Sequence, residues 1–287
     1  MTATANATAP QRDATREQTP SGASYARQVR SLVRRNLIHI KRQPEMLSDV
    51  TIQPIMFVLL FAFVFGGSIA TTSEAGYREW LLPGIMGQTM AFASFIVALG
   101  LNNDLQKGII DRFRSLPMAK SSVLVARSIS SLMHSSIGIL VMALTGLIVG
   151  WRIRGSIGDA ILAFGLLLLF GFAMIWIGIL VGSSMRSVEA VNGVMFSTMF
   201  PITFLANTFA PTENMPTWLR TIAEWNPISS LVQSLRQLWG NDGGVPVPDG
   251  ASWPLHHPIL MSAGWSILIA AIFAPLAIRA YTKRTTD

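Results

Sequence analysis

Six apolar stretches alternate with polar segments along this chain, and each is about 20 residues long. A helix of that length crosses the hydrocarbon core of a bilayer, about 30 Å thick, at a rise of about 1.5 Å per residue. The pattern therefore predicts an all-α integral membrane protein with one transmembrane domain over residues 49–280. Its six spans are expected at 49–70, 81–101, 124–150, 159–182, 188–208 and 258–279.

Residues 25–43, ahead of the first stretch, place apolar and basic side chains on different faces of a helix. Such a helix lies in the plane of the membrane interface rather than across it. We expect an amphipathic elbow helix, either a plain membrane anchor or a brace that also touches a cytoplasmic partner. Residues 1–24, which are small and polar, are expected to form a disordered cytoplasmic tail. The basic positions of the elbow include Arg30, Arg34, Arg35 and Arg42.

The polar segment between the second and third stretches, residues 102–117, also has the pattern of an amphipathic helix. Leu105, Ile109, Phe113 and Leu116 recur at helical spacing, and Pro117 ends the helix. Charge-rich loops of this size face the cytoplasm. From the pattern alone, the segment fits either the groove of another protein or the layer of lipid headgroups.

The long segment after the fifth stretch predicts two short helices over residues 214–240. Pro216 precedes one helical pattern and Pro227 begins the next, since proline is favoured at the start of a helix. We expect these helices to be extracellular and re-entrant, dipping into the outer leaflet or lying along it. Trp218, Trp225 and Trp239 are typical of the boundary between water and lipid.

Composition and charge support a membrane location and set an orientation. Only 13% of the 287 residues are charged, against about 25% in soluble proteins. Most of the 22 Lys and Arg residues flank the spans on the side of both termini, which predicts that both termini, including the tail 281–287, are cytoplasmic. The net charge of +7 lies at the ends of apolar stretches, where lipid headgroups attract it, so the plasma membrane rather than nucleic acid is the expected partner.

The chain lacks the motifs of an enzyme. It has no cysteine, no G-x-x-x-x-G-K-[ST] phosphate loop and no H-E-x-x-H, so we expect no catalytic residues, no metal and no cofactor on this chain. His134 stands alone in an apolar stretch, and this position favours the role of a buried structural histidine over that of a proton relay. Asp49, Glu189 and Asp159 lie only at the ends of spans, unlike the buried acids of ion-coupled carriers.

Some polar and polarizable side chains lie deeper in the spans. The fifth span carries Met and Phe side chains that suit varied apolar ligands, although such residues also serve as plain core or lipid contacts. Glycines four residues apart predict close helix approach, within the bundle or at a dimer seam; they are Gly146 with Gly150 and Gly178 with Gly182. The candidate substrate path comprises Gln53, Gln88, Asn192, Met195, Phe196, Met199 and Asn207, and Phe200 and Phe204 share the same span.

Three blocks of this sequence, over residues 42–67, 104–129 and 214–236, resemble permease subunits of the ABC-2 export family, most of all the daunorubicin-resistance type. The middle block, DLQKGIIDRFRSLPMAKSSVLVARSI, is the most specific of the three. The resemblance implies a half-transporter: two permease subunits, identical or homologous, form the pathway, and two copies of a separate ATPase that binds ATP and Mg²⁺ dock below. It also implies that residues 102–117 are the cytoplasmic coupling helix, with contact positions at Asp104, Lys107, Gly108, Asp111, Arg112, Phe113, Arg114, Leu116 and Pro117.

The expected function is therefore ATP-driven export of an amphiphilic drug or lipid, with the chain itself not an enzyme. One alternative within this class is export of a cell-envelope lipid or polysaccharide. A proton-driven multidrug carrier would need an essential acid in the membrane, for which Asp49 and Glu189 are the candidates. The identity of the substrate does not follow from the sequence.

Overall fold

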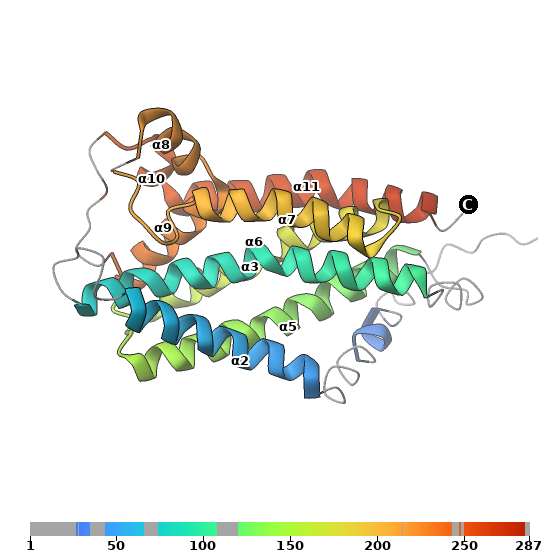
Figure 1. Cartoon of the computed structure of the whole chain (residues 1–287), viewed down its shortest axis with the longest axis horizontal. Coiled ribbons are helices and arrows are strands. Elements are labelled where there is room, and N and C mark those ends of the chain that lie inside the picture. The colour runs from blue at the N-terminus through green and yellow to red at the C-terminus, as the bar shows by residue number, and fades with distance from the viewer. Residues whose placement is uncertain are drawn as a thin grey trace, which may run out of the picture.

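The computed structural model describes residues 27, 29–34, 44–65, 74–107, 120–213, 215–242, 247 and 250–284. Every regular element in these ranges is a helix (Figure 1). In chain order they are α2 (Pro44–Leu60), the π-helix η1 (Phe61–Phe65), α3 (Glu74–Gln106), α5 (Lys120–Val149), α6 (Ile157–Ser184), α7 (Val188–Leu205), α8 (Thr217–Glu224), α9 (Pro227–Trp239), α10 (Trp253–His256) and α11 (Pro258–Arg284).

Five of these helices, α3, α5, α6, α7 and α11, are long and apolar enough to cross a membrane. They coincide with the second to sixth expected spans to within a few residues at most ends, so the all-α membrane class is confirmed. A further apolar helix, Thr51–Val64, is shorter. It falls within the first expected span, 49–70, which the structure describes only as far as residue 65.

Helices α3 and α6 form the centre of the bundle. Helix α11 packs on α6, α7 packs on α3, and α2 packs on α5 along the opposite side (Figure 1). The central pair approaches closely because α6 has glycine at its contact positions. A Cβ atom on Gly178 would lie 2.1 Å from the carbonyl oxygen of Ser94, and one on Gly182 would lie 2.5 Å from that of Ala98. This glycine pair therefore packs inside the bundle.

The two short helices expected over 214–240 are present as α8 and α9. Asn226 caps α9 by accepting a hydrogen bond from the Ile228 amide, Pro227 is its first residue, and Gly240 ends it with a φ of 66°. Helix α9 is largely buried against α3, α6 and α11. Trp239 is therefore fully enclosed and packs edge-to-face against Trp151, rather than lying at the water–lipid boundary.

Several expected boundaries fall partly outside the described residues. Helix α3 continues to Gln106, so residues 102–106 of the expected coupling helix extend a long membrane helix, and residues 108–119 are outside the description. In the expected elbow, residues 29–34 are helical, with Arg30 and Arg34 exposed and Leu32 buried. Arg35, Arg42, the tail 1–24 and residues 285–287 are outside it as well.

Candidate functional site

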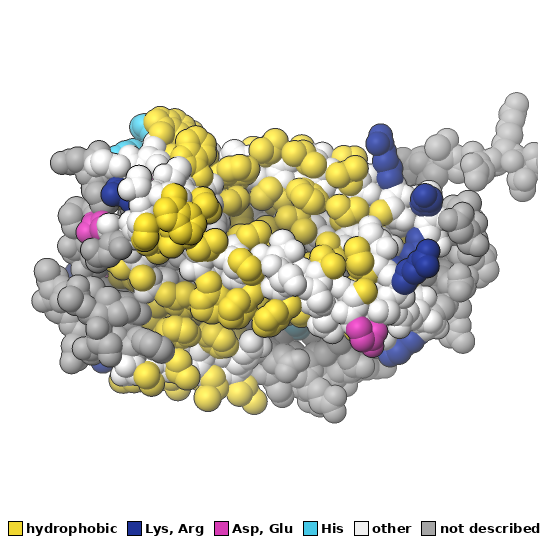
Figure 2. Space-filling view, turned by 45° about the horizontal axis from the view of Figure 1, so that its top comes forward, with side chains coloured by type: hydrophobic (Ala, Val, Ile, Leu, Met, Phe, Trp, Pro, Cys, Tyr) yellow, Lys and Arg dark blue, Asp and Glu magenta, His cyan; other side chains and the backbone are white. Residues whose placement is uncertain are grey.

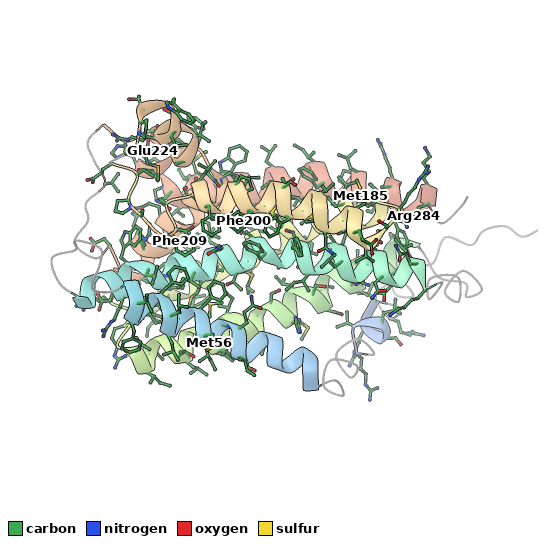
Figure 3. The ribbon with its side chains drawn as sticks, in the orientation of Figure 1. Met56, Met185, Phe200, Phe209, Glu224 and Arg284 are labelled. Carbon is green, nitrogen blue, oxygen red and sulfur yellow. The ribbon has the colours of Figure 1, made fainter. Side chains whose placement is uncertain are left out.

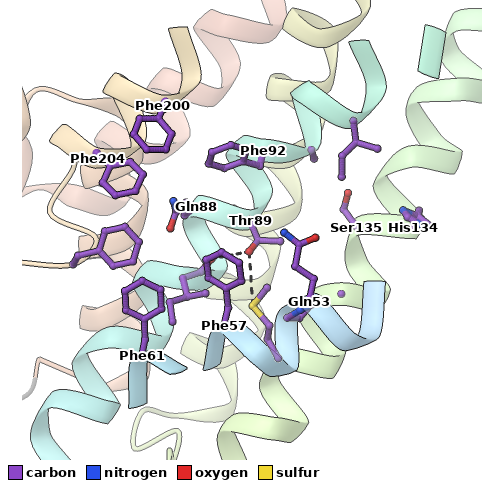
Figure 4. A pocket seen from close by; sticks show the side chains of 17 residues that line it. Gln53, Phe57, Phe61, Gln88, Thr89, Phe92, His134, Ser135, Phe200 and Phe204 are labelled. Carbon is purple, nitrogen blue, oxygen red and sulfur yellow. Dashed lines mark hydrogen bonds between the residues drawn. The ribbon is translucent and has the colours of Figure 1, made fainter. Parts of the chain in front are cut away.

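A pocket of about 260 Å³ lies between α2, α3, α5 and α7 (Figure 4). Its lining is mostly apolar and contains two chemically different groups of side chains. The aromatic group comprises Phe57, Phe61, Phe92, Phe200, Phe204 and Phe209. The polar group comprises Gln53, Gln88, Thr89, His134 and Ser135, and Gln88 lies beside the rings in Figure 4.

None of the described residues that line the pocket is an acid, a lysine or an arginine. The polar side chains can therefore orient a ligand through hydrogen bonds from amides, hydroxyls and one imidazole, while the aromatic rings supply apolar contact. Thr89 is fixed by donating to the carbonyl of Ile85 at 2.9 Å and, more weakly, to the sulfur of Met142 at 3.8 Å (Figure 4). This arrangement suits an amphiphile whose polar groups do not need an ion pair with the protein.

The pocket includes only part of the candidate substrate path. Gln53 and Gln88 lie together in its lining, with Gln88 only 7% exposed. Asn192 and Phe196 point out of the bundle on α7. Asn207 is buried in the turn after α7, where its backbone N–H donates to Ser229 Oγ at 3.0 Å.

The two methionines of the candidate path lie on the core-facing side of α7. Met195 and Met199 are buried among core residues, and the Met199 sulfur accepts a hydrogen bond from Ser94 on α3. The aromatic side chains one position further along α7 occupy a different stripe, and of these Phe200 and Phe204 reach the pocket. His134 and the rings from α2 and α3 also line it, and only the tertiary structure shows that they do.

The last turns of α3 form a polar joint with the turn between α6 and α7. We call Asn102, Asp104 and Gln106 the α3 joint. The fully buried Asn102 amide donates to the carbonyls of Gly182 at 3.0 Å and Met185 at 2.7 Å. Gln106 donates to the Asn102 side chain at 3.1 Å and to the Arg186 carbonyl at 3.3 Å. These bonds tie the end of α3 to the end of α6 and to the turn before α7.

Asp104 connects the same end of α3 to α5. It forms an ion pair with Arg127, whose side chain is 23% exposed while that of Asp104 is 36% exposed. A Cβ on Gly100 would lie 2.6 Å from the Arg127 guanidinium, so the glycine makes room for the cation. The pair joins α3 to α5, the helices on either side of residues 108–119. These two helices carry most of the polar side chains that line the pocket.

Helix α11 reaches the same end of the bundle. Arg284 donates to the carbonyls of Gly182 at 3.2 Å and Ser183 at 3.1 Å, and also to that of Met185 (Figure 3). These carbonyls have no partner within α6 because the helix ends there, so an arginine is a favourable cap. Lys and Arg side chains gather at this end in the view of Figure 2.

The remaining contact positions expected from the resemblance stay predictions. Lys107 is described and exposed at the end of α3. Gly108, Asp111, Arg112, Phe113, Arg114, Leu116 and Pro117 lie outside the described residues. Within the described part of the chain, no group of three or more His, Asp or Glu side chains is placed to hold a metal ion.

Comparison with known proteins places this architecture in a family. The chain is 29% identical over 250 residues to a daunorubicin resistance ABC transporter permease protein of Streptomyces coeruleorubidus, which covers 87% of this chain and 84% of the relative. It is 24% identical over 234 residues to a Mycobacterium tuberculosis protein named as a probable doxorubicin resistance ABC transporter permease, covering 81% and 80%.

Residues 27–239 match the ABC-2 type transporter family. This range covers most of the chain and includes the α3 joint and every element that lines the pocket. Together with the membrane-length helices, the match shows a multi-pass membrane protein with the role of a transport permease. The chain belongs to the ABC-2 type transporter family.

Proposed function

We propose that this chain is the permease subunit of an ATP-driven exporter and that the pocket is part of the path of an amphiphilic drug or lipid. Its lining, which combines phenylalanine rings with a few polar side chains and contains no acid, lysine or arginine, is the observation that carries this proposal. The similarity to permeases named for drug resistance supports it. In this proposal six spans cross the plasma membrane, both termini are cytoplasmic, and α8 to α10 lie outside the cell.

The power source in this proposal is a separate protein. The sequence contains no phosphate-binding loop, so ATP and Mg²⁺ would be bound by two copies of an ATPase subunit. Residues 102–117 would dock into a groove of that ATPase. A second permease subunit, identical or homologous, would complete the pathway.

The α3 joint offers a route from the docking segment to the pocket. A push on residues 108–117 would act on the end of α3 and, through Asp104 and Arg127, on the start of α5. The Asn102 and Gln106 bonds would carry the same movement to the turn before α7. Because α3, α5 and α7 all line the pocket, a rigid shift of this end would change its shape.

A membrane lipid is the second candidate substrate. Several side chains at the rim of the pocket are exposed on the outside of the bundle: Phe57 is 39% exposed, Phe200 is 42% exposed and Ile96 is 60% exposed. A molecule dissolved in the bilayer could therefore enter sideways without passing through water.

Partner capture tests the docking assignment. The full-length chain, extracted from its own membranes in detergent, should bring down a nucleotide-binding subunit. Phe113→Asp or Leu116→Asp should abolish this, because a charge in an apolar socket is strongly disfavoured. Ser115→Asp, which adds the same charge off the apolar stripe, is the matched control. Unchanged capture by Phe113→Asp and Leu116→Asp, with normal insertion, would refute the docking assignment.

Vesicles containing the purified chain test the power source. The chain alone should move no fluorescent lipid or drug probe with ATP present, and adding the captured ATPase should start transport. Uphill transport by the chain alone, driven by a proton gradient, would instead support a carrier.

A further inference from the structure

Six phenylalanine rings form an unbroken series, and five of them line the pocket. Along α7, the ring centroids of Phe196 and Phe200 are 5.1 Å apart, and those of Phe200 and Phe204 are 4.2 Å apart. The series continues from Phe204 to Phe209 at 5.5 Å and from Phe209 to Phe61 at 4.8 Å. We call this series, which ends with the Phe61–Phe57 contact at 5.9 Å, the phenylalanine arch.

The arch crosses from α7 to α2 at one end of the pocket. Phe61 follows the last residue of α2, and Phe209 lies between α7 and α8. Their contact is therefore at the end of the pocket nearest α8 (Figure 3). In the proposed topology this is the outer end. Stacked rings at this end would exclude water and separate the pocket from the exterior.

The Phe209 side of this contact is held rigidly. Arg236 of α9, only 1% exposed, donates to the carbonyls of Asn207 at 2.9 Å and Thr208 at 3.3 Å. Its guanidinium also donates to the Trp80 carbonyl at 3.0 Å and stacks over the Trp80 ring at 3.5 Å. The residues directly before Phe209 are thus fixed to α3 and α9.

Close backbone packing reinforces this anchor. A Cβ on Gly84 of α3 would lie 2.5 Å from the Thr208 carbonyl oxygen. Because Gly84 and the Thr208 carbonyl meet through backbone atoms, the turn cannot slide along α3 unless the backbone of one of them moves. Phe209 is therefore the stationary half of the contact.

The Phe61 side is built differently. Pro54 lies inside α2 and lines the pocket, and a proline there removes a helical hydrogen bond and allows a bend. From Phe61 to Phe65 the chain is a π-helix, a rare geometry that often marks functional sites and has a different hydrogen-bond register from the α-helix. The chain thus has two places, Pro54 in α2 and the π-helix η1 directly after it, where the helix direction and the orientation of its rings can change.

We propose that the Phe61–Phe209 contact is the outer gate of the pocket. Arg236 is the positioning residue that holds the fixed half, and α2 is the half that moves. This inference rests on the proposed function, because it makes α8 to α10 extracellular. When α2 bends at Pro54 or changes register at η1, Phe61 leaves Phe209 and the pocket opens to the outside.

The absence of cysteine from the natural chain makes an accessibility test direct. Gln88→Cys places a thiol in the pocket, where the native side chain is 7% exposed. Trp218→Cys places one on α8, where the native side chain is 67% exposed. Intact cells are treated with a membrane-impermeant maleimide, and the labelling rate of each thiol is measured on the full-length protein.

We expect Trp218→Cys to label quickly and Gln88→Cys slowly. Adding Phe209→Ala to Gln88→Cys removes the ring contact with Phe61, which crosses the gate and is worth a factor of about two to ten in an equilibrium. Labelling should therefore rise at least about twofold. Phe196→Ala is the matched control, because Phe196 belongs to the arch but does not line the pocket; it should leave the rate unchanged.

A second variant tests the anchor. Arg236→Lys keeps the cation but has fewer donors in a different geometry, so it should also increase labelling of Gln88→Cys. An unchanged rate in this variant would overturn the assignment of Arg236 as the positioning residue.

Two outcomes separate the gate from the proposed function. Equal labelling with Phe209→Ala and Phe196→Ala, while Trp218→Cys still labels from outside, would overturn the gate and leave the exporter proposal intact. Failure of Trp218→Cys to label in intact cells would instead refute the orientation in the proposed function and, with it, an outer gate.

Discussion

Replacing Gly178 with alanine would force apart the two helices at the centre of the bundle. The new Cβ would lie 2.1 Å from the carbonyl oxygen of Ser94 and 3.0 Å from its Cα. Both are backbone atoms, so no side chain can turn away to make room. Restoring an ordinary separation of about 3.5 Å requires α3 and α6 to move apart by roughly 1.4 Å. Overpacking of this kind destabilises a protein by about 1–3 kcal/mol.

Gly165→Ala provides a control in the same helix. No atom lies within 4 Å of the position that its Cβ would take, and the residue is exposed on α6. The same substitution there adds only the helix preference of alanine over glycine, up to about 1 kcal/mol in favour of the folded state. The two variants should therefore change stability in opposite directions.

Heating in detergent followed by size-exclusion chromatography gives an apparent Tm for each variant. Each kcal/mol corresponds to a shift of about 2–4 °C for a chain of this size range. Gly178→Ala should melt below the native protein, and Gly165→Ala should melt at or above it. If Gly178→Ala is as stable as Gly165→Ala, the close approach of α3 and α6 is wrong.

Three further predictions concern the polar contacts at the two ends of the bundle. Asn102→Leu removes the two hydrogen bonds from Asn102 to the carbonyls of Gly182 and Met185, which keep Arg284 as their donor. Because each lost bond contributes about 0.5–1.5 kcal/mol, the apparent Tm should fall by an amount equivalent to about 1–3 kcal/mol, and the dependence of transport on ATP hydrolysis in reconstituted vesicles should weaken. For the partly exposed Asp104–Arg127 pair, a double-mutant cycle with alanine should give a coupling of about 1 kcal/mol that falls in high salt; zero coupling at low salt would contradict the pairing. Burial raises the pKa of Glu224. Hydrogen bonds to its carboxylate from Arg220 and other neighbouring donors outweigh burial and hold that pKa below the ordinary value. Its contribution to stability is thus complete above the ordinary carboxyl pKa of about 4.3 and is lost as pH falls through the lower folded value. Limited proteolysis from the outer side should show α8 loosening only in that acidic range, and Glu224→Gln should remove the pH dependence.

Much of the fold follows from short-range pattern. Apolar stretches of membrane length appear as α3, α5, α6, α7 and α11, because each such helix satisfies its own backbone hydrogen bonds regardless of its neighbours. The start of α9 at Pro227 was likewise predictable, since capping depends on residues within one turn. Hydropathy did not predict where α3 ends. The helix continues through polar residues to Gln106, and their side chains bond to α6, to the turn after it and to α5.

The candidate site was predictable only in part. The sequence indicated that polar groups in the spans and the rings of the fifth span were candidates, and Gln53, Gln88, Phe200 and Phe204 do line the pocket. Spacing alone could not decide which stripe of α7 faces the core. The structure turns Met195 inward and away from the pocket.

What the sequence by itself determined is the set of membrane helices, the two short helices before the last of them, and the family. Only the tertiary structure decided how those helices neighbour one another, and with it the pocket, the α3 joint and the phenylalanine arch. Arg236 shows the difference: by position it is one of two arginines in the segment between the last two spans, yet it is buried and donates to three carbonyls from two other segments. Hydropathy and capping depend on neighbours along the chain, whereas packing depends on residues as far as 156 positions apart, and no local pattern records those contacts.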